Sequence, residues 1–90
     1  MATVHLIIKG KVQGVFFRAT AKEVADEIGV TGWIKNTEDG NVEAMVRGSD
    51  VQLQKFIAWC KVGPRKAVVT HVKAMNVEEK NFESFQVIRR

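Results

Sequence analysis

Arg18 is the residue of this sequence best placed to bind an anion, because it ends a glycine-containing segment that leads into a helical pattern. The segment Gly10–Arg18 (GKVQGVFFR) joins a strand pattern, Thr3–Lys9, to a helix pattern, Ala19–Ile28. A loop before a helix leaves backbone N–H groups free at the positive end of the helix dipole. Glycines at positions 10 and 14 allow the positive φ angles that gather such groups into a concave nest. The segment therefore predicts a phosphate site, although an ordinary strand-to-helix turn has a similar composition.

Asn36 is the second candidate for chemistry. It stands at the end of a strand pattern, directly before the turn Thr37–Gly40. A side-chain amide can donate to one water molecule and accept from it at the same time. Beside a bound phosphoryl group, Asn36 would position an attacking water. A simple turn residue is the alternative interpretation, since asparagine is also common before turns.

Composition limits the kinds of protein that this chain can be. Its 90 residues predict one domain, residues 1–90, and no apolar run has the length of a membrane span. A net charge of +4 and an isoelectric point near 9.5 favour anionic partners, either small molecules or nucleic acid. The single cysteine, Cys60, excludes an internal disulfide and a cysteine metal cluster. Because the N-terminal residues do not resemble a secretory signal, we expect a cytoplasmic protein.

The elements that must position Arg18 and Asn36 follow from the apolar spacing. An Asp-Gly pair between two alternating runs predicts a hairpin, and a capping box at Ser49 and Gln52 predicts the start of a second helix. Val69 and Val72, three residues apart, predict a β-bulge or an early bend in the fourth strand. The remaining predicted strands are Val30–Asn36, Asn41–Gly48, Ala67–Val77 and Phe82–Arg89, and the second helix ends at Gly63-Pro64.

This order, β-α-β-β-α-β followed by a short last strand, predicts an α+β fold of the ferredoxin-like sandwich type. With right-handed crossovers, the strands form an antiparallel sheet and the two helices cover one of its faces. Such a fold serves many functions, so the function has to be argued from the candidate site.

The sequence resembles the acylphosphatase family in two long motifs. Gly10–Arg18 fits the family pattern Gly-x-Val-Gln-Gly-Val-x-Phe-Arg throughout. Gly32–Glu43 (GWIKNTEDGNVE), with Gly48 behind it, fits except at Ile34, where the family more usually has valine or alanine. The likeness covers nearly the whole chain.

The resemblance implies hydrolysis of an acyl phosphate to a carboxylate and inorganic phosphate, without metal or cofactor. It implies that Arg18 is the phosphate-binding catalytic residue and that Asn36 orients the attacking water. It further implies an acyl phosphate as the substrate and inorganic phosphate as product and inhibitor. We expect no nucleic-acid or membrane partner, and we expect a monomer. The residues expected to bind phosphate, mainly through backbone amides, are Gln13, Gly14, Val15, Phe16, Phe17 and Arg18.

The chemistry of such a reaction is compatible with this small set of residues. The leaving carboxylate has a conjugate acid with a pKa of roughly 4 to 5, so it departs without a general acid. Phosphoryl transfer mainly requires positioning and charge stabilisation, which an arginine and several N–H donors can supply. No general base is evident, because His5 and His71 both lie in strand patterns on a face expected to be open. A phosphate oxygen of the substrate is the hypothetical proton acceptor.

Two other functions remain compatible with the predicted fold. A ferredoxin-like nucleic-acid-binding module reads bases with aromatic side chains on its sheet, whereas the third strand pattern, Asn41–Gly48, contains no aromatic residue. A regulatory module without catalysis would not need both Arg18 and Asn36. Neither metal-ligand spacing nor a P-loop is present in the sequence.

Overall fold

The computed structural model describes residues 1–89 of the protein. The strands and helices follow one another in the predicted order, with small differences at their ends. Their bounds are β1 (Ala2–Lys11), α1 (Phe17–Ile28), β2 (Thr31–Asn36), β3 (Val42–Gly48), α2 (Asp50–Val62), β4 (Val68–Val77) and β5 (Phe85–Ile88).

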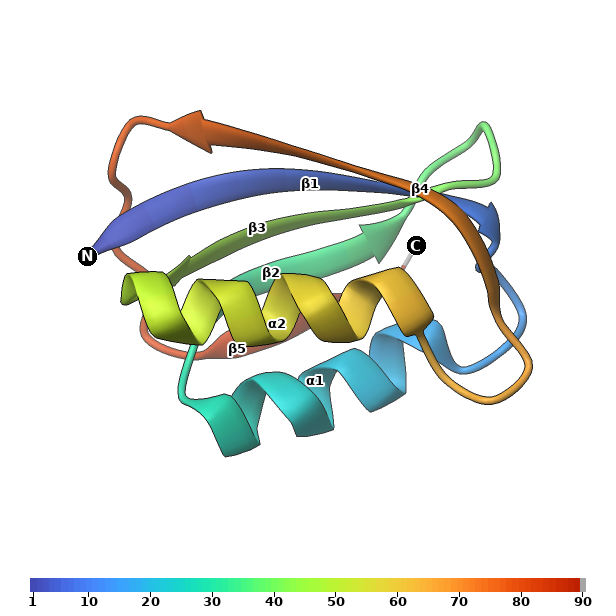
Figure 1. Ribbon diagram of the computed structural model, residues 1–90, viewed down its shortest axis with the longest axis horizontal. Coiled ribbons are helices and arrows are strands. Elements are labelled where there is room, and N and C mark those ends of the chain that lie inside the picture. Colours follow the sequence, from blue (N-terminus) through green and yellow to red (C-terminus); the bar gives the residue numbers. More distant parts are fainter. Residues whose placement is uncertain (90) are drawn as a thin grey trace.

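The strands form one sheet in the order β4-β1-β3-β2-β5, and both helices cover the same face of it (Figure 1). This arrangement confirms the predicted ferredoxin-like α+β fold. The sheet is not antiparallel throughout, because β5 pairs with β2 in parallel. The connection from β4 passes around the end of the sheet at which β2 begins, so that β5 enters the sheet running beside β2 in the same direction (Figure 1).

The core lies between the helices and the sheet. Alternate residues of β1, at positions 4, 6 and 8, are buried there, as the strand pattern predicted. Three phenylalanines are almost fully buried in the same layer: Phe17 of α1, Phe56 of α2 and Phe85 of β5. The ring centroids of Phe56 and Phe85 lie 5.6 Å apart, which joins the short edge strand to the second helix. Both helices and β5 thus share one apolar layer.

Gly10 belongs to the sheet, whereas the sequence pattern predicts that it is part of the anion-binding loop. It pairs with Val69 while Lys9 pairs with His71, so Thr70 is the extra residue of the predicted bulge in β4. A Cβ atom on Gly10 would lie 2.1 Å from the Val68 carbonyl oxygen. The glycine is therefore required by the close approach of β4, and the loop that leads to α1 begins only after Lys11.

Neither helix in the described residues has the length and apolar character needed to cross a membrane. Of the two, α2 begins as predicted, with a capping box in which Ser49 accepts from the amide of Gln52 and the side chain of Gln52 accepts from the amide of Ser49. Gln52 also donates to the carbonyl of Ile28 at the end of α1, over 3.1 Å. The start of α2 is thus capped by the protein's own groups.

Candidate active site

The start of α1 differs from that of α2, because no side chain caps it. Its N-cap residue is Phe16, which lies in the left-handed region with φ 64° and ψ 25° and makes no side-chain capping hydrogen bond. Phe16 is the only non-glycine residue with positive φ among the described residues, and its side chain is 79% exposed. A left-handed conformation costs a non-glycine residue roughly 1–2 kcal/mol. Because the ring is mostly exposed, its burial does not compensate for this strain. The strain therefore indicates that the left-handed backbone conformation itself has a function.

The backbone amides of residues 14–18 donate to no protein acceptor within the described part of the chain. The first turn of α1 also contains no acidic residue, whereas the first turn of α2 contains Asp50. The positive φ angles of Gly14 (74°) and Phe16 bend the loop that carries these amides. Free amides, positive φ angles and the positive end of a helix dipole together form an anion-binding nest.

Arg18 lies in the first turn of α1 and is fixed by the last strand. Its Nη1 atom donates to the carbonyl oxygen of Ile88 in β5 over 3.1 Å. A guanidinium has five N–H donors in a planar fork, so the others remain available to a ligand. The group is partly buried, and the contact with Ile88 holds it near the nest.

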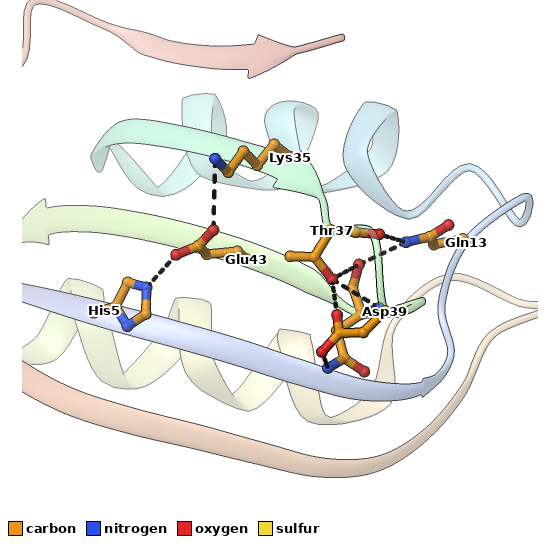
Figure 2. Close-up of polar contacts among 7 residues, drawn as sticks. His5, Gln13, Lys35, Thr37, Asp39 and Glu43 are labelled. Atoms are coloured by element: carbon orange, nitrogen blue, oxygen red, sulfur yellow. Dashed lines mark hydrogen bonds and ion pairs between the residues drawn. The ribbon is translucent and has the colours of Figure 1, made fainter. Parts of the chain in front are cut away.

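Gln13 connects the loop to the β2–β3 hairpin. Its Nε2 atom donates to the carbonyl oxygens of Thr37 and Asn41, each over 2.8 Å (Figure 2). Because this clamp occupies both N–H groups of the side-chain amide, only the backbone amide of Gln13 is left for the predicted role in phosphate binding. The clamp also brings the end of β2 close to the nest.

Asn36 is the last residue of β2, immediately before the clamped turn. Its side-chain oxygen Oδ1 is buried and has no hydrogen-bond partner within the described residues. Buried polar atoms in native proteins almost always have a partner, from the protein or from ordered water. Because Oδ1 is closed off from solvent, a water molecule can bind to it only after the side-chain amide turns.

The nest, Arg18 and Asn36 line one open cleft of about 480 Å³. Among residues 1–89, Arg18 and Arg89 are the charged residues of its lining and no acidic residue takes part, so the cleft favours a negatively charged ligand. A second cleft of about 800 Å³ adjoins it and shares Asn36. The residues that line the first cleft are Val12, Gly14, Phe16, Phe17, Arg18, Ala19, Asn36 and Arg89.

Most of the predicted site residues therefore meet in one place, with two exceptions. The side chain of Gln13 lies in the second cleft, and the side chain of Val15 is buried in the core, where it anchors the loop. Two features were not predicted from the sequence: the contact of Arg18 with Ile88, and Arg89 at the mouth of the cleft. Both depend on the parallel placement of β5 beside β2, which no local pattern specifies. The only signal in the sequence was the pair of arginines at positions 89 and 90.

The two histidines lie away from the cleft, as the strand pattern predicted. His71 is exposed on β4, and Nε2 of His5 lies 2.6 Å from Oε2 of Glu43 on the sheet face without helices (Figure 2). Lys35 lies on the other side of the same carboxylate, 3.7 Å from Oε1.

Among residues 1–89, no three His, Cys, Asp or Glu side chains are grouped so that they could hold a metal ion. Cys60 is buried in the core, and this burial raises the pKa of its thiol.

Comparison with known proteins gives one consistent result. Residues 4–87 match the model of the family described as acylphosphatase. The chain is 47% identical, over 98% of its length and 95% of the relative's, to an acylphosphatase of Pyrobaculum arsenaticum. It is 50% identical to one from a Roseiflexus strain, over 80% of this chain and 77% of that one. A crystal structure of acylphosphatase from Bacillus subtilis superposes with a TM-score of 0.95 at 31% identity, covering 99% of this chain and 100% of that chain.

Proposed function

The chain belongs to the acylphosphatase family, and from that premise we propose that Arg18 and Asn36 are the residues that carry out its hydrolysis of acyl phosphates. The observation that supports this assignment most strongly is the single cleft in which the uncapped start of α1, the guanidinium of Arg18 and the unpartnered amide of Asn36 face one space. The whole chain, residues 1–90, is proposed to act as one domain.

The phosphoryl group of the substrate binds to the nest formed by the backbone amides of residues 13–18. Its oxygens take the place of the acceptors that these amides lack in the protein, and the guanidinium of Arg18 stabilises the charge that develops on them. The anchor to Ile88 keeps the guanidinium in position, so that less side-chain entropy is lost when the substrate binds. The result is a preorganised anion site without metal or cofactor.

Asn36 positions the attacking water on the other side of the phosphorus atom. Its side-chain amide turns so that Oδ1, which is otherwise closed off from solvent, accepts a hydrogen bond from the water and leaves the water oxygen directed at phosphorus. The water oxygen bonds to phosphorus, the bond from phosphorus to the acyl oxygen breaks, and the carboxylate leaves with the electron pair of that bond. The proton of the water passes to a phosphate oxygen of the substrate, since no protein base lies in the lining of the cleft.

The same site accounts for the partners of the protein. The substrate is an acyl phosphate, and inorganic phosphate, which is both product and the simplest ligand for the nest, inhibits competitively. The protein acts as a monomer in the cytoplasm and requires neither a nucleic acid nor a membrane for activity.

Steady-state hydrolysis of benzoyl phosphate in the presence of EDTA tests the proposal. We expect turnover by the wild-type chain to be unaffected by the chelator, and inorganic phosphate to raise KM without lowering kcat. Arg18→Ala provides the matched control that loses turnover. Loss of activity on chelation that a divalent metal restores would contradict the metal-free mechanism, and noncompetitive inhibition by phosphate would contradict the shared anion site.

A further inference from the structure

A row of four side chains crosses the sheet face that carries no helix. His5 pairs with Met45 of β3 on one side and with Met75 of β4 on the other, and Met45 pairs in turn with Trp33 of β2. These strands are neighbours in the sheet, and the helices cover the opposite face (Figure 1). Directly opposed residues of antiparallel strands place their Cβ atoms about 5 Å apart on the same face. Met75, His5, Met45 and Trp33 therefore stand side by side.

The donor atoms in this row are soft. We propose that Met45, Met75 and His5 form a binding site for a monovalent copper-group ion, Cu(I) or Ag(I). The two methionines flank the histidine directly, and their unbranched, adaptable side chains can turn the sulfur atoms toward it. Two thioether sulfurs and one imidazole nitrogen make a three-donor set, and thioether ligands select Cu(I) among the biological metals.

The orientation of His5 suits a metal ligand. Nε2 of His5 lies 2.6 Å from Glu43, and both side chains are only 24% exposed. Figure 2 shows that the second ring nitrogen is turned away from Glu43. Histidines that bind metals commonly donate their other N–H to a carboxylate, which fixes both the ring and its tautomer. Glu43 is itself held by Lys35, 3.7 Å away, so the carboxylate is a stable partner for the ring.

The charges around the row favour a monovalent ion over a divalent one. The row itself contains no carboxylate and no thiolate, the ligands on which Ca²⁺ and Mg²⁺ sites and most structural Zn²⁺ sites depend. The nearest carboxylate, Glu43, is held by His5 and Lys35. Lys73 and Lys35 occupy the neighbouring positions on β4 and β2, where each adds a positive charge. The indole of Trp33, next to Met45, already has the ammonium of Lys35 over its ring, 5.5 Å from the centroid.

The exposure of the methionines also needs an explanation. Met75 is 50% exposed on an open sheet face, where apolar side chains contribute little to folding. In a purely structural interpretation, the sulfur of Met45 packs against the ring of Trp33 and Met75 has no role. That interpretation predicts an effect of Met45 on stability and no affinity for metal, so the two can be distinguished.

The test uses Ag(I), which has the ligand preferences of Cu(I) without its redox chemistry, added to the full chain in chloride-free buffer without thiols. The ¹³C-methyl NMR signals of the methionines are followed during the titration. We expect the signals of Met45 and Met75 to shift together and to saturate at one equivalent, while Met1, which is exposed and outside the row, serves as the internal control. Parallel shifts of all three methionines, or no shift of Met45 and Met75, would overturn the proposal.

Matched variants extend the test. Met45→Leu with Met75→Leu keeps the apolar volume and removes both sulfurs, and it should weaken Ag(I) binding at least about tenfold; Glu43→Gln should weaken it by about tenfold through His5. The control variant His71→Gln should bind like the wild type. Because none of the ligand residues lines the cleft of Arg18, benzoyl phosphate hydrolysis checks that the double variant is folded. Unchanged affinity in that variant would refute the site, whatever the outcome for hydrolysis.

Discussion

At the scale of single residues, Arg18 has two tasks that one lysine cannot perform. It donates to the carbonyl of Ile88 while facing the cleft, and this depends on the geometry of a planar fork. We expect Arg18→Ala to lower kcat by roughly three orders of magnitude, since one transition-state donor alone is worth about 10²–10³. Arg18→Lys should keep less than about a tenth of the wild-type rate.

The measurement is kcat on benzoyl phosphate for both variants, with Arg65→Lys, at an exposed position outside the cleft, as the control expected to be normal. A lysine variant with more than a tenth of the rate would show that a single point charge is sufficient and that the fork has no special role.

Asn36 allows catalysis and stability to be separated at one position. Since Oδ1 of Asn36 has no protein partner, Asn36→Ala removes no hydrogen bond observed in the described residues and should change the free energy of unfolding by less than about 0.5 kcal/mol. We expect kcat to fall strongly while inhibition by phosphate stays nearly normal. Asn36→Asp should be no better in turnover and should bind phosphate more weakly, because it brings a negative charge beside the anion.

These two variants are compared in kcat, phosphate inhibition and thermal midpoint. Near-normal turnover in both, together with a lowered midpoint, would make Asn36 a turn residue and assign the water to another group.

At the scale of elements, the loop before α1 stores strain that can be measured. Gly14 and Phe16 both have positive φ, and the space around a Cβ on Gly14 is open. Gly14→Ala should therefore destabilise the fold by about 1–2 kcal/mol through backbone strain alone. Phe16→Gly should be more stable than Phe16→Ala by about 1 kcal/mol, because only the alanine keeps the strain. Urea unfolding of the three variants measures this, and an alanine at position 16 as stable as glycine would contradict the assigned backbone shape.

The Gln13 clamp holds two elements together, the loop and the β2–β3 hairpin. Gln13→Ala removes two hydrogen bonds, to carbonyls that keep other donors, and should cost about 1–2 kcal/mol. It should also lower kcat, because Asn36 and the nest are then no longer fixed relative to each other. Gln13→Glu has the same size but brings a carboxylate against two carbonyls, so we expect it to be at least as damaging.

Thermal midpoints and kcat of these two variants are compared with those of Gln86→Ala. That exposed glutamine donates only to Ser84, two residues away, and its loss should be almost neutral. A Gln13→Ala variant with normal kcat would mean that the hairpin holds its position without the clamp.

At the scale of the whole molecule, ligand binding and folding are linked through the cleft. The nest and Arg18 exist only when β1, α1 and β5 are assembled, so we expect phosphate to bind the native state and to stabilise it. At a phosphate concentration of 100 Kd the expected stabilisation is about 2.7 kcal/mol. The thermal midpoint of the wild-type chain should rise with phosphate, and that of Arg18→Ala should rise much less. Sodium chloride at matched ionic strength is the control, and an equal rise in both proteins would indicate nonspecific salt stabilisation.

Much of this protein can be predicted from its sequence because the signals are local. Apolar spacing predicts the strands and helices, the Asp-Gly pair predicts the hairpin, and Ser49 with Gln52 predicts the start of α2. The loop before α1 could be predicted as an anion site because glycines, a helix start and Arg18 follow one another along the chain. The spacing of Val69 and Val72 even located the bulge of β4.

Contacts between residues far apart in the chain were decided only by the tertiary structure. The sequence pattern predicts Gly10 in the loop, but the close approach of β4 makes it part of the sheet. The anchor from Arg18 to Ile88 spans 70 residues and depends on β5 lying parallel to β2. The row of Met75, His5 and Met45 comes from three strands and has no spacing in the sequence that predicts it. Local patterns are set by each segment's own residues, whereas strand order and register are set by how all the apolar faces are buried together.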